Sequence, residues 1–247
     1  MNMRFIAVLL AAGAAFAQND AKPAFEAAFI KANTTGSGSS SSNGTKGQVV
    51  MTNLSLRRLI ERAYNVKPFQ VISPEWTEGV RFDISAKYPE NTKQADRPAM
   101  LRNLLEERFK LITHGEQKEL AGYALVVAKT GLKLKPAEAD ADAGTSSNSS
   151  NNAVTLKVTS IPMSDLADYL AQRVGSAVVD KTGLEGKYSF ELHWTLDDSN
   201  GGPSDGGAAE FAAVQEAIGS IGLHLQAQKV PVQMVVVDHV ERVPTEN

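Results

Sequence analysis

Two segments of the chain share one pattern, and this internal repetition limits the fold more than any other feature. QVVMTNLSLRRLIERAYN and TLKVTSIPMSDLADYLAQRVG each begin with strand-like residues and continue with apolar residues at helical spacing. At a constant offset, residues 51–56 align with residues 158–163. Asn53 and Ser160 then occupy the position expected for a helix N-cap, and Pro162 suits a first helical turn. A repeat of this length predicts two copies of one supersecondary unit.

The similarity continues beyond the first helix of each half. FQVISPEW and RFDISAKYP in the first half, and SAVVD and KYSFELHWT in the second, are typical of paired strands. MLRNLLEERF and EFAAVQEAIGSIG predict a second helix, and extended sequence with a final hairpin closes each half. We therefore predict an α+β fold of two tandem βαββαβ repeats, each a small sheet with its helices on one face. The repeats cover residues 48–136 and 153–247, and the second contains a Gly-rich loop at 197–207.

Two low-complexity segments separate these units. Residues 34–47 are rich in Ser and Gly, and residues 137–152 are rich in Ala, Ser and Asn. Such segments bury too little apolar surface to offset the entropy of ordering, so both are expected to be flexible linkers. Residues 18–33, which include FEAAFIKAN, are expected to add an edge strand to the first repeat.

The first residues, MNMRFIAVLLAAGAAFAQND, have the pattern of a secretory signal peptide. Arg4 gives a positive start, an apolar core follows, and Ala15-Phe16-Ala17 forms a small-x-small cleavage site. We expect cleavage between Ala17 and Gln18, so that residues 1–17 are removed and the protein is periplasmic or secreted. No later stretch is long and apolar enough to predict a membrane span.

Composition narrows the chemistry further. The chain contains no Cys, which excludes disulfides, thiol catalysis, thiolate metal sites and lipid attachment to cysteine. The net charge of -3 includes Arg4, so removing residues 1–17 leaves -4. Because the sequence predicts no basic face, we expect neither nucleic acid nor anionic lipid as a partner.

The stretch AVVDKTGLEGKYSFE contains DKTG, which also opens the phosphorylation motif of cation-pumping ATPases. An aspartyl-phosphate enzyme needs a parallel α/β domain and further acidic residues that hold magnesium. The repeat instead places DKTGLEG between two strands of one sheet, with Gly183 and Gly186 at positions that favour a chain reversal. We interpret Asp180 as a turn residue.

No other motif predicts catalysis or a cofactor. The four histidines have no spacing that favours a metal site on one helix or strand; they are His114, His193, His224 and His239. The sequence contains no GxSxG, SxxK or phosphate-binding loop. The arginines of RRLIER and LRNLLEERFK are interpreted as ion-paired helix surfaces. Trp76 and Trp194 fit sugar-stacking platforms or, in the simpler interpretation, packing at strand ends.

The ordered series RRLIERAYNVKPFQVISPEW, RFDISAKYP, MLRNLLEERFKLITHGEQKELAGYALVVAKTGLKLKP and VVDKTGLEGKYSFELHWT resembles a large paralogous family of exported soil-bacterial proteins of uncharacterised function. In that family the module also occurs attached to membrane metallopeptidases, but this chain has no HExxH zinc motif. Each half also loosely resembles the short N-terminal domain of secretins and TonB-dependent receptors. That resemblance implies docking of partner proteins.

These observations predict an exported, non-enzymatic binding module that docks a protein or peptide partner and carries no cofactor or metal. The exposed edges of small sheets offer strand addition as a binding mechanism. Candidate binding residues are Trp76, His114 and Tyr123, near a groove expected between the two repeats. The alternative is an extracellular hydrolase or carbohydrate-binding protein, which requires a polar cleft with converging His or carboxylate groups.

Overall fold

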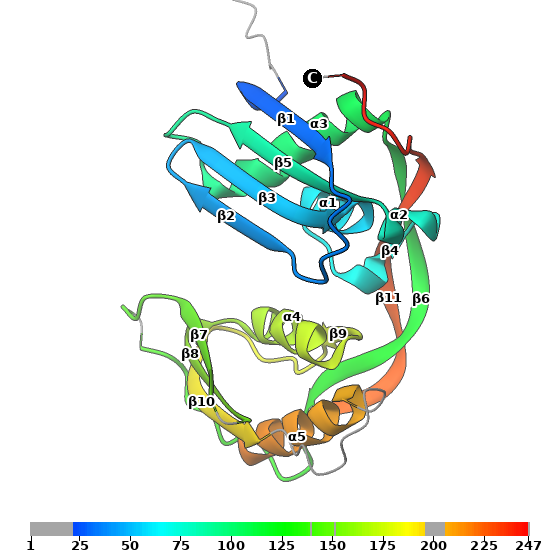
Figure 1. Ribbon diagram of the computed structural model, residues 1–247. Helices are drawn as coiled ribbons and strands as arrows, with labels where there is room; N and C mark the ends of the chain where they lie inside the picture. Colours follow the sequence, from blue (N-terminus) through cyan, green and yellow to red (C-terminus); the bar gives the residue numbers. More distant parts are fainter. Residues whose placement is uncertain (1–21, 139, 151, 196–205, 247) are drawn as a thin grey trace, which may run out of the picture.

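The computed structural model describes residues 22–138, 140–150, 152–195 and 206–246, with the side chains of 206–209 left aside. The predicted signal peptide with its cleavage site at Ala17 and Gln18 lies outside these residues, as does most of the Gly-rich loop at 197–207. Within the described residues the chain is a mixed α+β protein with three sheets and five α-helices (Figure 1).

The first sheet and two helices enclose the core of the first half. Its strand order is β1-β5-β3-β2, and all neighbouring strands are antiparallel. Apolar side chains from the sheet and from α1 and α3 are buried together, as the helical spacing of Leu56, Leu59 and Ile60 predicts. The elements are β1 (Ala27–Ala32), β2 (Ser41–Thr45), β3 (Gln48–Ser55), α1 (Leu56–Tyr64), β5 (Arg81–Lys87) and α3 (Arg97–Phe109).

The second half has a corresponding sheet with strand order β10-β8-β7. Tyr188, Leu192 and Trp194 of β10 are buried while the residues between them are exposed, apart from half-buried Phe190, which agrees with the predicted alternation. Helices α4 and α5 pack in the same core. The elements are β7 (Gly144–Ser150), β8 (Ala153–Ile161), α4 (Met163–Val174), β10 (Tyr188–Thr195) and α5 (Gly206–Ser220).

The third sheet joins the halves, because each half contributes one long and one short strand to it. The long strands β6 (Ile112–Val127) and β11 (Leu223–His239) pair antiparallel along nearly their whole length. The short strand of each half pairs parallel with the long strand of the other half, which gives the order β4-β11-β6-β9 (Figure 1). The short strands are β4 (Val71–Ile72) and β9 (Ala177–Asp180).

Gly122 allows β9 and β11 to pair with β6 on its two sides. A Cβ at this position would lie 2.6 Å from the carbonyl oxygen of Ala177 and 2.8 Å from a methyl carbon of Val230. Because those distances are far below van der Waals contact, only glycine lets β9 approach β6 while β11 packs on the other side.

The order of elements predicted for each half is present, but two separate tandem repeats are not what the structure shows. After the first strand, α1-β4-β5-α3-β6 and α4-β9-β10-α5-β11 follow in the predicted β-α-β-β-α-β order. The expected final hairpin of each half is wrong, because each closing segment is one continuous strand. The turn-like glycines Gly115 and Gly122 lie within β6 and do not have positive φ. Pairing with β11 holds them extended.

The segments expected to be flexible linkers contain two outer strands. Ser41–Thr45 forms β2 against β3, and Gly144–Ser150 forms β7 against β8. Nearly all side chains of both strands are exposed, so side-chain burial does not drive their order. Backbone hydrogen bonding to an apolar neighbouring strand provides pairing that composition alone does not reveal.

The helices α1 and α4 begin two residues later than the sequence predicts. The N-cap of α1 is Ser55, whose hydroxyl accepts a hydrogen bond from the Arg58 N–H, and the N-cap of α4 is Pro162. Asn53 and Ser160 still lie in strands, and the predicted N-cap role for them is wrong.

Asn53 and Ser160 instead form two matching β-bulges. Each adopts a left-handed conformation, with φ of 58° at Asn53 and 50° at Ser160. The Asn53 N–H donates to the Asp83 carboxylate at 2.8 Å, and the Ser160 N–H donates to the Ser189 hydroxyl at 3.0 Å. A side chain of the next strand therefore satisfies the N–H that each bulge removes from the ladder.

Candidate functional site: the groove between the halves

A groove of about 460 Å³ lies where the first and second halves face each other. One wall is formed by the C-terminal half of α1 and by η1 (Pro68–Gln70), and the other by the C-terminal end of α4. We call it the inter-half groove. Its lining includes Arg58, Arg62, Asn65, Lys67, Phe69 and Gln172.

Both helices end at this groove in the same way. Asn65 follows α1 with φ of 50°, and Gly175 follows α4 with φ of 62°. The left-handed residue stops each helix, as in common C-terminal caps. Two helix C-termini carry partial negative charge, which favours basic side chains such as Arg62 and Lys67 nearby.

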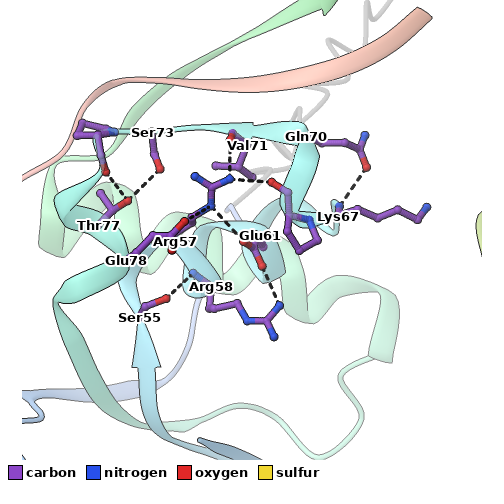
Figure 2. A network of polar contacts seen from close by, with 12 residues as sticks. Ser55, Arg57, Arg58, Glu61, Lys67, Gln70, Val71, Ser73, Thr77 and Glu78 are labelled. Atoms are coloured by element: carbon purple, nitrogen blue, oxygen red, sulfur yellow. Dashed lines mark hydrogen bonds and ion pairs between the residues drawn. The ribbon is translucent and has the colours of Figure 1, made fainter. Parts of the chain in front are cut away.

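The wall formed by η1 is held in place by Arg57 (Figure 2). Its guanidinium donates to the carbonyl oxygens of Pro68 at 2.9 Å and Val71 at 3.0 Å. The Nε atom lies 3.5 Å from the carboxylate of Glu61 and 3.3 Å from that of Glu78. One side chain of α1 therefore anchors the loop between α1 and α2 (Trp76–Gly79) to the helix.

Glu61 is the buried member of this network. Its side chain is 7% exposed, and its second oxygen lies 3.2 Å from the Arg58 guanidinium. A buried carboxylate requires paired donors, and Arg57 and Arg58 supply them to the two oxygens of Glu61.

Lys67 links the halves across the groove. Its ammonium nitrogen lies 2.6 Å from the Asp168 carboxylate of α4, with the Lys67 side chain 18% exposed and Asp168 71% exposed. Nearby, the Gln70 side chain accepts from the Lys67 N–H at 3.0 Å and donates to the Gln233 carbonyl at 3.0 Å. These contacts tie η1 to α4 and to β11.

The described lining of the groove consists mainly of basic, amide and apolar side chains. Its described lining residues include no His, Ser, Thr or Tyr, and its one carboxylate is that of Glu61. General acid–base catalysis of glycoside hydrolysis needs two carboxyl groups across a cleft, which this lining does not provide. The lining offers cations, backbone carbonyls and the aromatic ring of Phe69.

The structure does not bring the predicted site residues together. Trp76 is half-buried at the start of α2, with the Arg242 guanidinium 4.7 Å from its ring centroid. His114 is exposed on β6, and half-buried Tyr123 packs against Phe211 with ring centroids 4.8 Å apart. None of the three predicted residues belongs to the described lining of the inter-half groove.

His114 has a carboxylate partner, which is one of the two partners that a catalytic triad gives its histidine. Its Nδ1 lies 2.8 and 2.9 Å from the two carboxylate oxygens of Asp238. The nearest hydroxyl in sequence, that of Thr113, bonds to the Tyr64 hydroxyl at 2.7 Å. Because neighbouring strand residues point to opposite faces, Thr113 cannot act as a nucleophile toward His114.

His193 and His224 also have local partners. His193 lies 3.0 Å from the Thr155 hydroxyl and 3.3 Å from the Glu191 carboxylate, and His224 bonds to Gln215. In the part of the chain that the structure describes, no three His, Asp or Glu residues gather as a metal site.

Asp180 closes the connection between β9 and β10. Its carboxylate accepts hydrogen bonds from the Thr182 N–H at 2.9 Å and the Thr182 hydroxyl at 2.7 Å. This local turn agrees with the interpretation of DKTG. The prediction that it joins two strands of one sheet is wrong, because β9 belongs to the shared sheet and β10 to the second sheet.

Sequence reasoning missed the residues of the inter-half groove. It assigned the arginines of RRLIER to ion-paired helix surfaces, which holds for Arg57 and Arg58. Arg62 forms no ion pair with a described residue. The only signal for Arg62 was its position at the predicted end of a helix, where basic residues are common.

The sequence profile of the DUF3738 family, described as a protein of unknown function, matches residues 57–240. The chain belongs to this family. It matches no curated protein and no solved structure. None of the helices in the described ranges has the length and apolar character needed to cross a bilayer.

Proposed function

We propose that this protein is a non-enzymatic binding module that docks a protein or peptide partner in the inter-half groove. The observation that carries the proposal is the groove itself, which combines walls from both halves with cations and an aromatic ring. A concave site at an interface between two packed units is the usual location for ligands. The pairing of Glu61, the one carboxylate of the described lining, with Arg57 and Arg58 supports binding over catalysis.

We also propose that the protein acts outside the cytoplasm, as a periplasmic or secreted protein. The support is the signal-peptide pattern of residues 1–17, with cleavage expected between Ala17 and Gln18. The absence of cysteine from the chain is compatible with this location but does not argue for it.

The halves, we further propose, are two copies of one βαββαβ unit whose long strands pair with each other. The matching bulges at Asn53 and Ser160 support this, as do the left-handed caps at Asn65 and Gly175. The loose resemblance of each half to partner-docking domains of secretins and TonB-dependent receptors favours a docking role.

Capture from the envelope fraction of the protein's own host, using immobilised residues 18–247, tests the groove. Gln172 is exposed on α4 and lines the groove, so Gln172→Trp fills it; Ser164→Trp is a matched change on the same helix outside the lining. We expect one partner to be retained by the wild type and by Ser164→Trp and lost with Gln172→Trp. Circular dichroism verifies that each variant is folded. Equal capture by all three proteins would show that the partner binds elsewhere.

A further inference from the structure

A second groove, of about 380 Å³, meets the inter-half groove at the end of α1. It lies between the N-terminal segment, strands β2 and β3, and the start of α3, and we call it the α3 groove. Arg62 and Asn65 line both grooves, so the two adjoin at the end of α1. The apolar wall of the α3 groove consists of Phe25, Val49, Met51, Tyr88 and Leu101.

The charges of the α3 groove are all of one sign. Its described lining contains Arg62 and Arg97 and no Asp or Glu. Arg97 is half-buried, and its guanidinium lies 4.8 Å from the centroid of the Tyr88 ring. The buried Nε of Arg97 has no hydrogen-bond partner among the described residues.

Two other arginines of this half, Arg57 and Arg58, are arranged differently. Arg57 and Arg58 share the Glu61 carboxylate, whereas neither Arg62 nor Arg97 forms an ion pair within the described part of the chain. The protein as a whole is acidic, with a net charge of -3, so an uncompensated pair of guanidinium groups runs against its overall charge. A guanidinium fork matches a carboxylate in geometry as well as charge.

We propose that the α3 groove continues the docking site and binds an extended peptide segment that carries an Asp or Glu beside a large apolar residue. The carboxylate binds Arg62 and Arg97, and the apolar side chain packs on Phe25, Val49 and Leu101. This inference rests on the proposed docking function and adds the chemistry of the partner.

Selection from a random peptide library displayed on phage, against immobilised residues 18–247, tests the inference even while the natural partner is unidentified. We expect the recovered peptides to be enriched in Asp or Glu next to aromatic or aliphatic residues. Arg62→Gln and Arg97→Gln should each weaken binding of a selected, fluorescently labelled peptide about tenfold, the loss expected for one charge-assisted contact. Arg242→Gln, which removes a guanidinium outside both grooves, should leave binding unchanged.

Two further variants keep the test decisive. Arg97→Lys retains the charge if Arg97→Gln impairs folding, and it should bind more tightly than Arg97→Gln. The Arg62→Glu protein should bind a peptide whose acidic residue is changed to Lys more tightly than wild type binds that peptide, because one of the two repelling guanidinium groups is replaced by a carboxylate.

The outcomes separate this inference from the proposed function. Recovery of no binding peptide would overturn this inference, and capture from the envelope fraction would still decide whether a folded protein docks. Peptides without acidic residues, or peptides that are insensitive to Arg62 and Arg97 but lost with Gln172→Trp, would overturn this inference and leave the docking function intact. Equal binding of an oligoglutamate peptide would show simple charge attraction and would also overturn it.

Discussion

The two halves of the protein differ most at the outer edge of their sheets. In the first half, β1 pairs with β5 over six residue pairs. In the second half, the corresponding segment meets β10 at one bridge among the described residues, between Pro136 and Tyr188. The corresponding edge is therefore covered by a full strand in the first half and by a single bridge in the second.

The shared part of this edge has the same geometry in both halves. The Asn33 N–H donates to the Arg81 carbonyl at 2.8 Å, and the Ala137 N–H donates to the Lys187 carbonyl at 2.8 Å. Each bond lies at the start of the strand that it joins, β5 or β10. Residues 136–137 thus occupy the place of the end of β1.

Chain connectivity explains why the second edge is short. The chain leaves β6 at Val127, turns at Gly131, and is held by a bond of 3.0 Å from the Lys133 N–H to the Ile221 carbonyl beside α5. Residues bound to Ile221 cannot also extend along β10. One unit can therefore keep its core while the chain connection at its edge determines whether an edge strand forms.

The largest expected effect tests whether the halves fold together. Leu59→Ala and Leu166→Ala remove fully buried side chains at matching positions of α1 and α4. Each should lower the free energy of unfolding by about 3 kcal/mol. Because β6 and β11 join the halves, Trp76 and Trp194 should report one shared transition in urea, measured in single-tryptophan variants. A Leu166→Ala protein in which only Trp194 unfolds early would contradict this cooperative coupling.

The residues that follow the second helix of each half differ as well. Lys110 and Gly222 are both left-handed, but a Cβ at Gly222 would overlap the Gly131 carbonyl oxygen and lie 2.9 Å from the Leu132 Cα. Gly222→Ala should therefore cost about 3 kcal/mol through backbone displacement and strain. Lys110→Ala should cost under about 1 kcal/mol. Thermal unfolding of both variants measures the difference, and equal losses would refute the close approach at Gly222.

Glu61 and Asp168 occupy matching helix positions with opposite burial. Glu61→Gln should cost about 2 kcal/mol, because Arg57 loses a carboxylate in a partly buried site. Asp168→Asn should cost less than about 1 kcal/mol, because the Asp168 carboxylate that pairs with Lys67 is 71% exposed and screened by salt. Urea unfolding at low and high salt checks both values. A larger loss for Asp168→Asn would mean that the link across the groove stabilises the fold.

The smallest expected effect concerns the connection from β4 to β5 in the first half and from β9 to β10 in the second half. Thr77 is fully buried, and its hydroxyl donates to the Pro74 carbonyl at 2.7 Å, whereas Asp180 lies in a half-buried turn. Asp180→Asn retains the acceptor oxygen, so it should change stability by about 1 kcal/mol or less. Incubation with labelled ATP should give no phosphate on the wild-type protein. Labelling that Asp180→Asn abolishes would restore the phosphoenzyme hypothesis.

Local sequence patterns specify the helices, most of the strands and their order. The apolar spacing of α1 and α4 and the alternation along β10 are local properties, and most of the residues that they predict to be inside are buried. The repeat also predicted the correspondence of residues 51–56 with 158–163, which the matching bulges support. The turn at Asp180 followed from residue types that favour turns.

Only the tertiary structure decided which strands pair and where a groove forms. Val127 and Leu223 pair across nearly a hundred intervening residues, and the periodicity of either strand is the same whichever partner it takes. The inter-half groove depends on that pairing, because β6 and β11 place the ends of α1 and α4 opposite each other (Figure 1). Arg62 and Arg97 lie 35 positions apart in the chain, and their shared groove exists only because α3 packs beside α1. Local sequence specifies what each residue can bury or bond, whereas long-range pairing specifies which residues meet.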